Sequence, residues 1–380
     1  MIINLKQLQS MCKRVSLAIE NNSVSVESGL INVNVKDGKL TLTVVDGDKS
    51  SCTYNVQLSC SVDTQEQMNA TIESKLFLSL VARLSGENVD LTVVSEALGH
   101  KLVIKSGDNS YTLRIAADSS TGESIQLADI ELKNIIQSTT IVSDEVNSIL
   151  DLSVALDNDD NFGIATAFLA DDSKVLAASS QGVCLCKKNK LRGSRLLLTK
   201  TIAKLFKLFD NNITLDYCEA KDTINGDLDV YKICLASNDT KVTAILPLEE
   251  STLLKSYRED AIMQYITMPQ NISVRVDRLS IIDALKRLQL FSTKLNPFIQ
   301  LDFDENALKL SVPGAGVNET VEYVDSDVDT SYQAFVDINT YLNYLSNLTS
   351  NQVEVSAGNR RAITLSNEDT TFIVLEAHEG

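Results

Sequence analysis

One segment of the sequence occurs three times, and this repetition constrains the fold more than any other feature. In the central copy, 198–217, the apolar residues Ile202, Leu205, Phe206 and Phe209 recur at the spacing of one helix face. Lysines occupy the opposite face, and a polar turn and an alternating strand follow. Matching segments lie 125 residues earlier and 139 residues later. A repeat of this length is the size of a domain rather than of a solenoid unit.

The elements expected around each copy follow one order: a helix, several strands, a second helix and several strands. We therefore expect an α+β fold of three tandem repeats, each with two helices and antiparallel sheets. A chain of 380 residues is long enough for about three domains. We place them at 1–125, 126–252 and 253–380. The expected helices are 5–19 and 74–85 in the first repeat, 131–142 and 198–209 in the second, and 276–291 and 337–348 in the third.

Basic residues are concentrated on these helices, although the chain is acidic. Its net charge of −17 would ordinarily argue against binding a polyanion. The six expected helices together carry +8, whereas the other 301 residues carry −25. A charged face in water explains any single helix, but repeated helices of one sign favour a shared basic surface. The candidate DNA-binding cations are Lys6, Lys13, Arg14, Lys75, Arg83, Lys200, Lys204, Lys207, Arg278 and Lys286. In the third repeat the corresponding helix face is neutral, with Asn339, Asn343 and Ser346.

The sequence offers little for catalysis or metal binding. The two histidines, His100 and His378, are far apart, which does not favour a Ser-His-Asp arrangement. Seven cysteines form no CxxC pair, and a zinc site needs about four suitably spaced ligands. Residues 45–48 resemble the start of a calcium loop but lack its later ligands, and no nucleophile-elbow, zinc-protease or Walker motif occurs. We therefore expect no catalytic residue, no metal and no cofactor; a catalytic pair assembled only by the fold stays open.

Membrane insertion and secretion are not expected either. No apolar run approaches the roughly 20 residues that cross a bilayer. The first residues, 1–15, lack the apolar core of a signal peptide. A cytoplasmic location is therefore the expectation.

Three domain-sized repeats with basic helix faces resemble the bacterial DNA sliding clamp, the beta subunit of the replicative polymerase. The resemblance spans the whole chain and is most specific at 168–182. This segment has the length and hydrophobic pattern of the hairpin that leads to the family's Ala-Thr-Asp-Gly-His-Arg-Leu motif. Here the motif reads Ser179-Ser180-Gln181-Gly182-Val183-Cys184-Leu185. Weaker matches are Thr199-Lys200 at the start of the next helix, 254–257 at the junction to the third domain, and 373–376 in the closing strand.

The resemblance implies three repeats of the DNA clamp fold with the helices lining the inside of a ring. In the family, two chains pair head to tail and encircle double-stranded DNA. The implied function is that of a processivity factor which tethers a replicative DNA polymerase, with no enzyme activity. Its implied partners are DNA, the polymerase, a clamp loader and a second copy of the chain. A basic lining would attract phosphates without reading bases. The alternatives are a clamp-like adaptor for repair or recombination factors, and a structural protein of the same repeats that binds no DNA.

The family also has an apolar groove between its second and third domains, where polymerases and the clamp loader insert a short peptide. The resemblance places this groove at Ser180, Gly182, Val183, Leu185, Leu254, Tyr257, Ile373 and Leu375. Val183 and Cys184 replace the family's His-Arg, and Lys255 and Glu376 replace prolines. These departures imply an altered partner preference and suit a divergent clamp encoded by a phage or plasmid. The alternative is that these apolar residues are strand and inter-domain core.

Overall fold

The structure is a computed structural model, and it describes most of the chain. It does not describe residues 20–28, 49–51, 97–98, 119–123, 143–145, 147–166, 172–173, 179–181, 187–195, 223–227, 248–263, 266, 294, 329–330, 359–360 and 377–380. The chain divides into unit 1, which contains 1–143 and 205–249, and unit 2, which contains 144–204 and 250–380. Because this division splits the second repeat, the predicted boundaries after residues 125 and 252 stay predictions.

The first repeat lies in unit 1. Its elements are β1 (Ile2–Asn4), α1 (Leu5–Val15), η1 (Ser16–Ala18), β2 (Leu30–Lys36), β3 (Lys39–Asp48), β4 (Cys52–Ser61), β5 (Met68–Glu73), α2 (Ser74–Val81), β6 (Asn88–Glu96), β7 (Gly99–Ser106) and β8 (Asn109–Arg114).

The second repeat contributes to both units. Its elements are β9 (Gln137–Ile141), β10 (Ala167–Asp171), β11 (Lys174–Ala178), β12 (Gly182–Cys186), β13 (Leu196–Thr199), α4 (Lys200–Leu205), η5 (Phe206–Leu208), β14 (Ile213–Asp222), β15 (Leu228–Ala236) and β16 (Thr240–Pro247).

The third repeat lies in unit 2. Its elements are β17 (Gln270–Asp277), α7 (Arg278–Gln289), β18 (Phe298–Phe303), β19 (Ala307–Val312), β20 (Val317–Asp327), β21 (Tyr332–Asp337), α8 (Ile338–Asn347), β22 (Gln352–Gly358), β23 (Ala362–Ser366) and β24 (Thr370–Leu375).

The strands repeat one pairing order three times. The orders β1-β6-β7-β8, β9-β14-β15-β16 and β17-β22-β23-β24 correspond to one another. So do the orders β5-β2-β3-β4, β13-β10-β11-β12 and β21-β18-β19-β20. We call a set of the first kind a terminal half-sheet, because it holds the first strand and the last three strands of its repeat. A set of the second kind is a central half-sheet.

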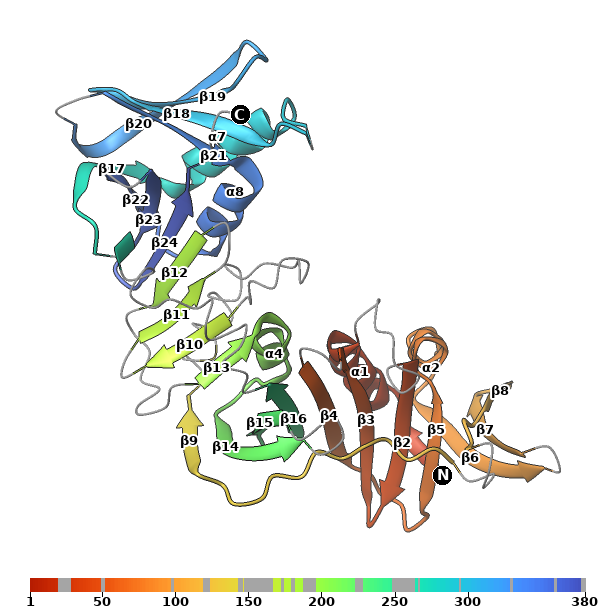
Figure 1. Cartoon of the computed structure of the whole chain (residues 1–380). Helices are drawn as coiled ribbons and strands as arrows, with labels where there is room; N and C mark the ends of the chain where they lie inside the picture. Colours follow the sequence, from red (N-terminus) through yellow and green to blue (C-terminus); the bar gives the residue numbers. More distant parts are fainter. Residues whose placement is uncertain are drawn as a thin grey trace. The chain divides into compact units, whose positions relative to one another are not determined.

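Neighbouring repeats join where a central half-sheet meets a terminal half-sheet. In unit 1, β4 pairs antiparallel with β16, with Val56 opposite Val242, and an eight-stranded sheet results (Figure 1). In unit 2, β12 pairs with β24 in the same way, with Val183 opposite Ile373. The far end of β20 also pairs with β17, which extends the unit 2 sheet to twelve strands. The fourth strand of one repeat thus pairs with the eighth strand of the next.

Two strand edges are left over by this scheme in the described part of the chain. β8 is the eighth strand of the first repeat, and it pairs with β7 alone. β20 is the fourth strand of the third repeat, and its residues 317–322 pair with β19 alone. These two edges correspond to the ones that form both repeat junctions.

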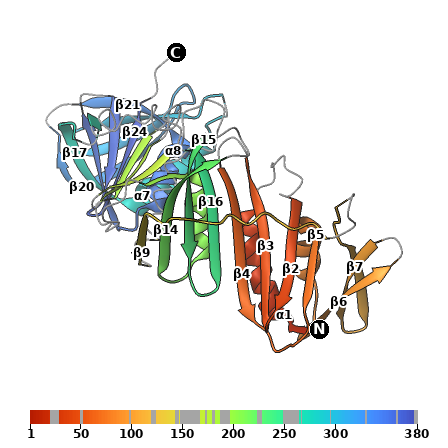
Figure 2. The same ribbon diagram turned by 60° about the horizontal axis from the view of Figure 1, so that its bottom comes forward.

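The helices begin at capping residues and bury one face. The side chain of Asn4 accepts a hydrogen bond from the backbone N of Gln7 at the start of α1, and Asp277 accepts one from Ser280 at the start of α7. Such caps satisfy backbone N–H groups that have no partner in the first turn. α1 buries an apolar face that includes Leu8, and it lies across the sheet that contains β2, β3 and β4 (Figure 2). No described helix is long and apolar enough to span a membrane.

The predicted helix at 131–142 is wrong. Residues 137–141 form β9, which pairs with β14 so that Ile141 lies opposite Ile213. Ile141 is buried whereas Ser138 and Thr140 are exposed, which is the alternation of a strand. β-branched residues favour strands, and here pairing with β14 decided between the two conformations. Since 131–142 carries no net charge, the other five helical segments still carry +8.

Candidate nucleic-acid interface and peptide groove

Five of the candidate DNA-binding cations lie in unit 1 and are exposed on helical segments or just beyond them. They are Lys6 and Lys13 on α1, Lys75 on α2, Arg83 after α2 and Lys207 on η5. The opposite faces of the same segments are buried, for example at Leu8 and Phe77. None of the five forms an ion pair with another residue in the described part of the chain. Their charges are therefore free to attract phosphate.

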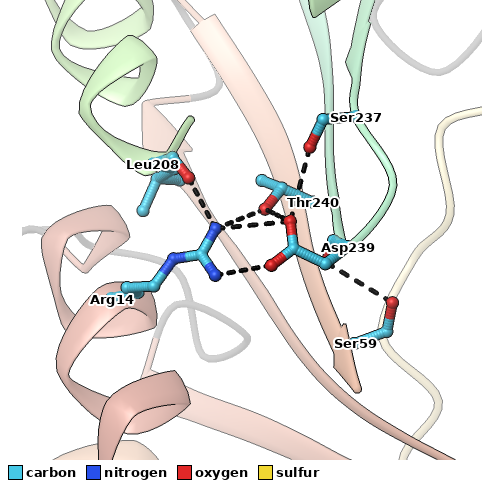
Figure 3. A network of polar contacts seen from close by, with 6 residues as sticks. All are labelled: Arg14, Ser59, Leu208, Ser237, Asp239 and Thr240. Atoms are coloured by element: carbon cyan, nitrogen blue, oxygen red, sulfur yellow. Dashed lines mark hydrogen bonds and ion pairs between the residues drawn. The ribbon is translucent and has the colours of Figure 1, made fainter. Parts of the chain in front are cut away.

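Arg14 differs from these cations, because its side chain is only 25% exposed and bonds to the second repeat. Its Nη1 donates to Oδ2 of Asp239 over 2.7 Å (Figure 3). Its Nη2 donates to Oγ1 of Thr240 over 2.6 Å and to the carbonyl oxygen of Leu208 over 2.7 Å. The guanidinium thus joins α1 to the β15–β16 turn and to the end of η5.

Asp239 is held on several sides as well. Its carboxylate also accepts a hydrogen bond from Oγ1 of Thr240 over 2.8 Å, and its carbonyl oxygen accepts one from Oγ of Ser59 over 3.4 Å (Figure 3). The same carbonyl oxygen accepts a hydrogen bond from the backbone N of Ser59 over 2.8 Å. The guanidinium of Arg14 holds the pKa of the Asp239 carboxyl below its ordinary value, chiefly by hydrogen bonding. We call this ion pair, together with the bonds from Arg14 to Thr240 and to the Leu208 carbonyl, the Arg14–Asp239 clasp. The charge of Arg14 is therefore engaged within the protein, unlike the charges of the five exposed cations.

In unit 2, the candidate cations also separate into free and engaged groups. Lys204 on α4 and Lys286 on α7 are exposed. Arg278 is half-buried, and its Nε donates to the carbonyl oxygen of Ser350 over 2.7 Å, while Nη1 donates to that of Leu345 over 3.4 Å. Leu345 lies in the last turn of α8, and a cation bound to its carbonyl oxygen stabilises that helix end. The backbone of Lys200 starts α4, but its side chain lies outside the described residues.

The structure brings five of the predicted groove residues onto two adjacent strands. Gly182, Val183 and Leu185 lie on β12, and Ile373 lies on β24 directly opposite Val183. Leu375 ends β24. The other three candidates, Ser180, Leu254 and Tyr257, lie outside the described residues.

The centre of this pair of strands is buried. Val183 is 5% exposed and Ile373 is 1% exposed, and Leu375 is half-buried. This burial fits the alternative interpretation, in which these apolar residues join two repeats. Glu376, which replaces a family proline, accepts a hydrogen bond from the hydroxyl of Tyr332. Burial raises the pKa of the Glu376 carboxyl.

Gly182 is required by the close approach of β12 to its neighbours. A Cβ atom at this position would collide with the carbonyl oxygen of Ile373 and would lie 2.8 Å from Oη of Tyr344 on α8. The ring of Tyr344 stacks on Phe372 with ring centroids 4.6 Å apart. The one glycine that the sequence shares with the family motif therefore allows the junction of the second and third repeats to close.

No protein-family model matches the sequence, and no curated protein matches it either. Solved structures match it over its whole length. DNA polymerase III subunit beta from Borrelia burgdorferi, in complex with a natural product, has a TM-score of 0.78 and 14% identity, covering 100% of this chain and 99% of that chain. The beta subunit from Thermotoga maritima has a TM-score of 0.76 at 14% identity, with the same coverage. The DNA polymerase sliding clamp from Pseudomonas aeruginosa has a TM-score of 0.74 at 14% identity, covering 99% of each chain.

The chain has the sliding-clamp fold. The predicted α+β class, with mostly antiparallel sheets and few helices, is confirmed. The resemblance read from the residues is confirmed for the fold, at an identity low enough for a divergent clamp. Among the described residues, no cluster of three or more potential metal ligands occurs, and residues 45–48 belong to strand β3 rather than to a loop.

One further charged residue on a helix of this clamp fold is not among the predicted DNA-binding cations. Arg287, near the end of α7, is 58% exposed and binds Glu319 on β20 through two hydrogen bonds. Its charge alone does not distinguish it from its neighbour Lys286. The signal that singles it out is its distance from the N-cap of its helix, which equals that of Arg14.

Proposed function

We propose that this chain is a DNA sliding clamp, a processivity factor that encircles duplex DNA and tethers a replicative DNA polymerase. The observation that carries the proposal is the match over the whole chain to beta subunits of DNA polymerase III. On this proposal the chain catalyses no reaction. Its work is to hold an enzyme close to DNA by enclosure.

The distribution of charge supports an interaction with the DNA backbone. The exposed cations of α1, α2, η5, α4 and α7 form no ion pair in the described part of the chain except Arg287, and they lie opposite the buried helix faces. Such cations bind phosphates without reading sequence, and the binding weakens with salt. α8 presents Asn339 and Asn343 in place of cations, so the attraction is expected to be uneven. Enclosure makes a strong static contact unnecessary.

The repeat topology supports a homodimer. Each repeat junction in the chain uses a fourth strand and an eighth strand, and β20 and β8 are the fourth and eighth strands left over. Two copies that pair head to tail satisfy both edges, and no edge is then left for a third copy. Closed symmetric assemblies of this kind are common among soluble proteins.

The remaining partners follow from the clamp function. A polymerase and a clamp loader would both dock short peptides beside β12 and β24, and the departures at Val183, Cys184 and Glu376 suggest peptides unlike those of better-known clamps. A cytoplasmic location is part of the same proposal. The same departures favour one alternative, a clamp that serves repair or recombination factors without a processivity role. The sequence of the peptide captured by the purified protein would distinguish the two functions.

The proposal is tested by imaging the purified protein in negative stain while its mass is measured in solution. Rings with a central hole wide enough for duplex DNA, at twice the chain mass, are expected at micromolar concentration. Solid particles, or a mass that fits no closed ring at any concentration, would contradict it.

A further inference from the structure

The last hairpin of every repeat carries an aspartate at the same place. In β15–β16, Ala236 lies opposite Lys241, and in β7–β8, Lys105 lies opposite Ser110. In each hairpin four residues lie between the two paired residues, and the third of the four is Asp239 in one and Asp108 in the other. The third repeat has Asp369 at the same place, since Ser366 lies opposite Thr371.

The first helices of the first and third repeats carry an arginine at the same place. Both helices begin with a side-chain cap, at Asn4 for α1 and at Asp277 for α7. Arg14 is ten positions after its cap, and so is Arg287. An equal distance along an α-helix gives an equal height and an equal direction around the axis. Arg287 therefore occupies in the third repeat the position that Arg14 occupies in the first.

The side chain of Arg287 points at the unpartnered edge of β20. Its Nε donates to Oε1 of Glu319 over 2.8 Å, and its Nη2 donates to Oε2 over 2.9 Å. Glu319 lies within 317–322, the part of β20 that pairs with β19 alone. A guanidinium has five N–H donors, so Nη1 and one N–H of Nη2 stay available for a second acceptor. The bidentate pair also holds the guanidinium in one orientation.

We propose that Arg287 forms an intermolecular clasp with Asp108 of a second copy of this chain, where β20 of one copy pairs with β8 of the other. This inference rests on the proposed function, because it assigns contacts to the junction that closes the ring. It is the intermolecular counterpart of the Arg14–Asp239 clasp at the pairing of β4 with β16. The other acceptors of Arg14 also have counterparts in the second copy. Thr240 corresponds to Asn109, and the carbonyl of Leu208 corresponds to that of Arg83.

The facing of side chains is compatible with this pairing. Tyr111 and Leu113 of β8 lie opposite the buried residues Ile104 and Leu102, so they share the buried face of their half-sheet. On β20, Glu319 and Val321 likewise lie opposite the buried residues Leu310 and Leu308. Residues opposite each other across an antiparallel pair share one face. Registers that set Tyr111 or Leu113 against Val317, Glu319 or Val321 continue the apolar layer across the junction.

Charge and exposed apolar surface also complement each other at these edges. β20 carries only acidic charges, at Glu319, Glu322, Asp325 and Asp327. β7 and β8 carry only basic formal charges, at Lys101, Lys105 and Arg114. Opposite potentials favour this partner over a like edge and speed the encounter. The exposed Leu290 and Phe291 follow Arg287 at the end of α7 and supply apolar area to the same region.

The test measures dimerisation of the full chain by mass photometry and sedimentation over a concentration series. In a dimer of R287D, two acidic residues face each other in both clasps. In a dimer of D108R, two arginines do so. Each variant is expected to raise the dimer Kd on the order of 100-fold, since one exposed clasp is worth on the order of tenfold and a dimer contains two. K309D is the matched control, because Lys309 also pairs with a carboxylate, Asp304, in the same half-sheet.

Mixing the two single variants gives the decisive result. In a dimer of R287D with D108R, one junction joins the two substituted residues with complementary charges, and the other joins the original Arg287 and Asp108. The equimolar mixture is therefore expected to dimerise nearly as tightly as the wild type, although neither variant does so alone. A misfolded variant could not be rescued in this way.

The possible failures are distinguishable. A wild-type chain that stays monomeric overturns the ring proposal and this inference with it. A wild-type dimer with single variants of unchanged Kd overturns the clasp and leaves the ring standing. A mixture that stays monomeric shows that Arg287 and Asp108 do not face each other. If K309D loses as much affinity as R287D, the loss comes from general charge repulsion, and the clasp is overturned.

Discussion

Removing the guanidinium of the Arg14–Asp239 clasp should loosen the junction between β4 and β16. R14A deletes three short hydrogen bonds of 2.6–2.7 Å, to Asp239, Thr240 and the Leu208 carbonyl, and a longer one of 3.5 Å to Asp239. A hydrogen bond to a charged group contributes roughly 1.5–3 kcal/mol when buried, but partial exposure to water weakens this contribution. We expect R14A to lower the free energy of opening at this junction by about 2 kcal/mol, which is about 30-fold in the opening equilibrium.

Hydrogen exchange followed by mass spectrometry measures this opening directly. Peptides from β4 and β16 should exchange about 30-fold faster in R14A, whereas peptides from β7 should exchange as in the wild type. R14K is the matched control. It keeps the positive charge but loses the planar fork, so an intermediate effect of about 1 kcal/mol is expected. Unchanged exchange in β4 and β16, or equal acceleration in β7, would refute the structural role of Arg14.

The clasp should also depend on pH through Asp239. Its pKa is lowered in the folded state, so the carboxylate contributes stability that is fully present above its unfolded pKa of about 4. That contribution is lost as the pH falls through the lowered folded pKa. Junction exchange in the wild type should therefore show an extra acceleration below about pH 4. In D239N this acid-dependent step should be absent.

Three further predictions concern other parts of the chain. G182A should lower the free energy of opening the β12–β24 junction by about 3 kcal/mol, because its Cβ would collide with backbone. Hydrogen exchange in β24 measures this opening. G29A is the control, since a Cβ at that position meets nothing within 4 Å. Charge reversal of three exposed cations should weaken binding to duplex DNA alike for all sequences and should flatten its dependence on salt, as fluorescence anisotropy would show; these cations are Lys6, Lys13 and Lys75. Burial raises the pKa of the Cys12 thiol to about 12, so it should resist alkylation at pH 8 in the folded protein and react only on unfolding. Fast native labelling of Cys12 would contradict its placement.

Local periodicity predicted much of the fold, because an apolar stripe and the helix it produces involve neighbouring residues. Five of the six expected helical segments were placed within a few residues of their observed ends. The segment 131–142 failed because its β-branched residues fit either conformation, and a distant strand, β14, supplied the hydrogen bonds. Tertiary pairing of this kind leaves no mark in a short window of sequence.

The engaged arginines show why part of the candidate site could not be predicted. Arg14 and Asp239 are 225 residues apart in the chain, and the sequence around Arg14 does not indicate its partner. Arg278 and Lys286 carry the same charge, yet Arg278 donates to the carbonyl oxygens of Leu345, in the last turn of α8, and of Ser350 beyond it. In contrast, the match between Arg14 and Arg287 was present in the sequence. It needed only the two N-cap positions and the structure of one junction to become visible.

A clamp holds DNA by enclosing it, so the most direct test of the proposed function compares circular with linear DNA. The protein is diluted until it is monomeric and mixed with a gapped circular plasmid. The mixture is then concentrated so that dimers close around the DNA, and it is passed over a gel-filtration column at high salt. We predict that it co-elutes with the circular plasmid and is lost from the same plasmid after a single cut by a restriction enzyme. Equal retention on circular and linear DNA would indicate ordinary surface binding, and failure of a dimeric protein to remain on the circle would contradict enclosure.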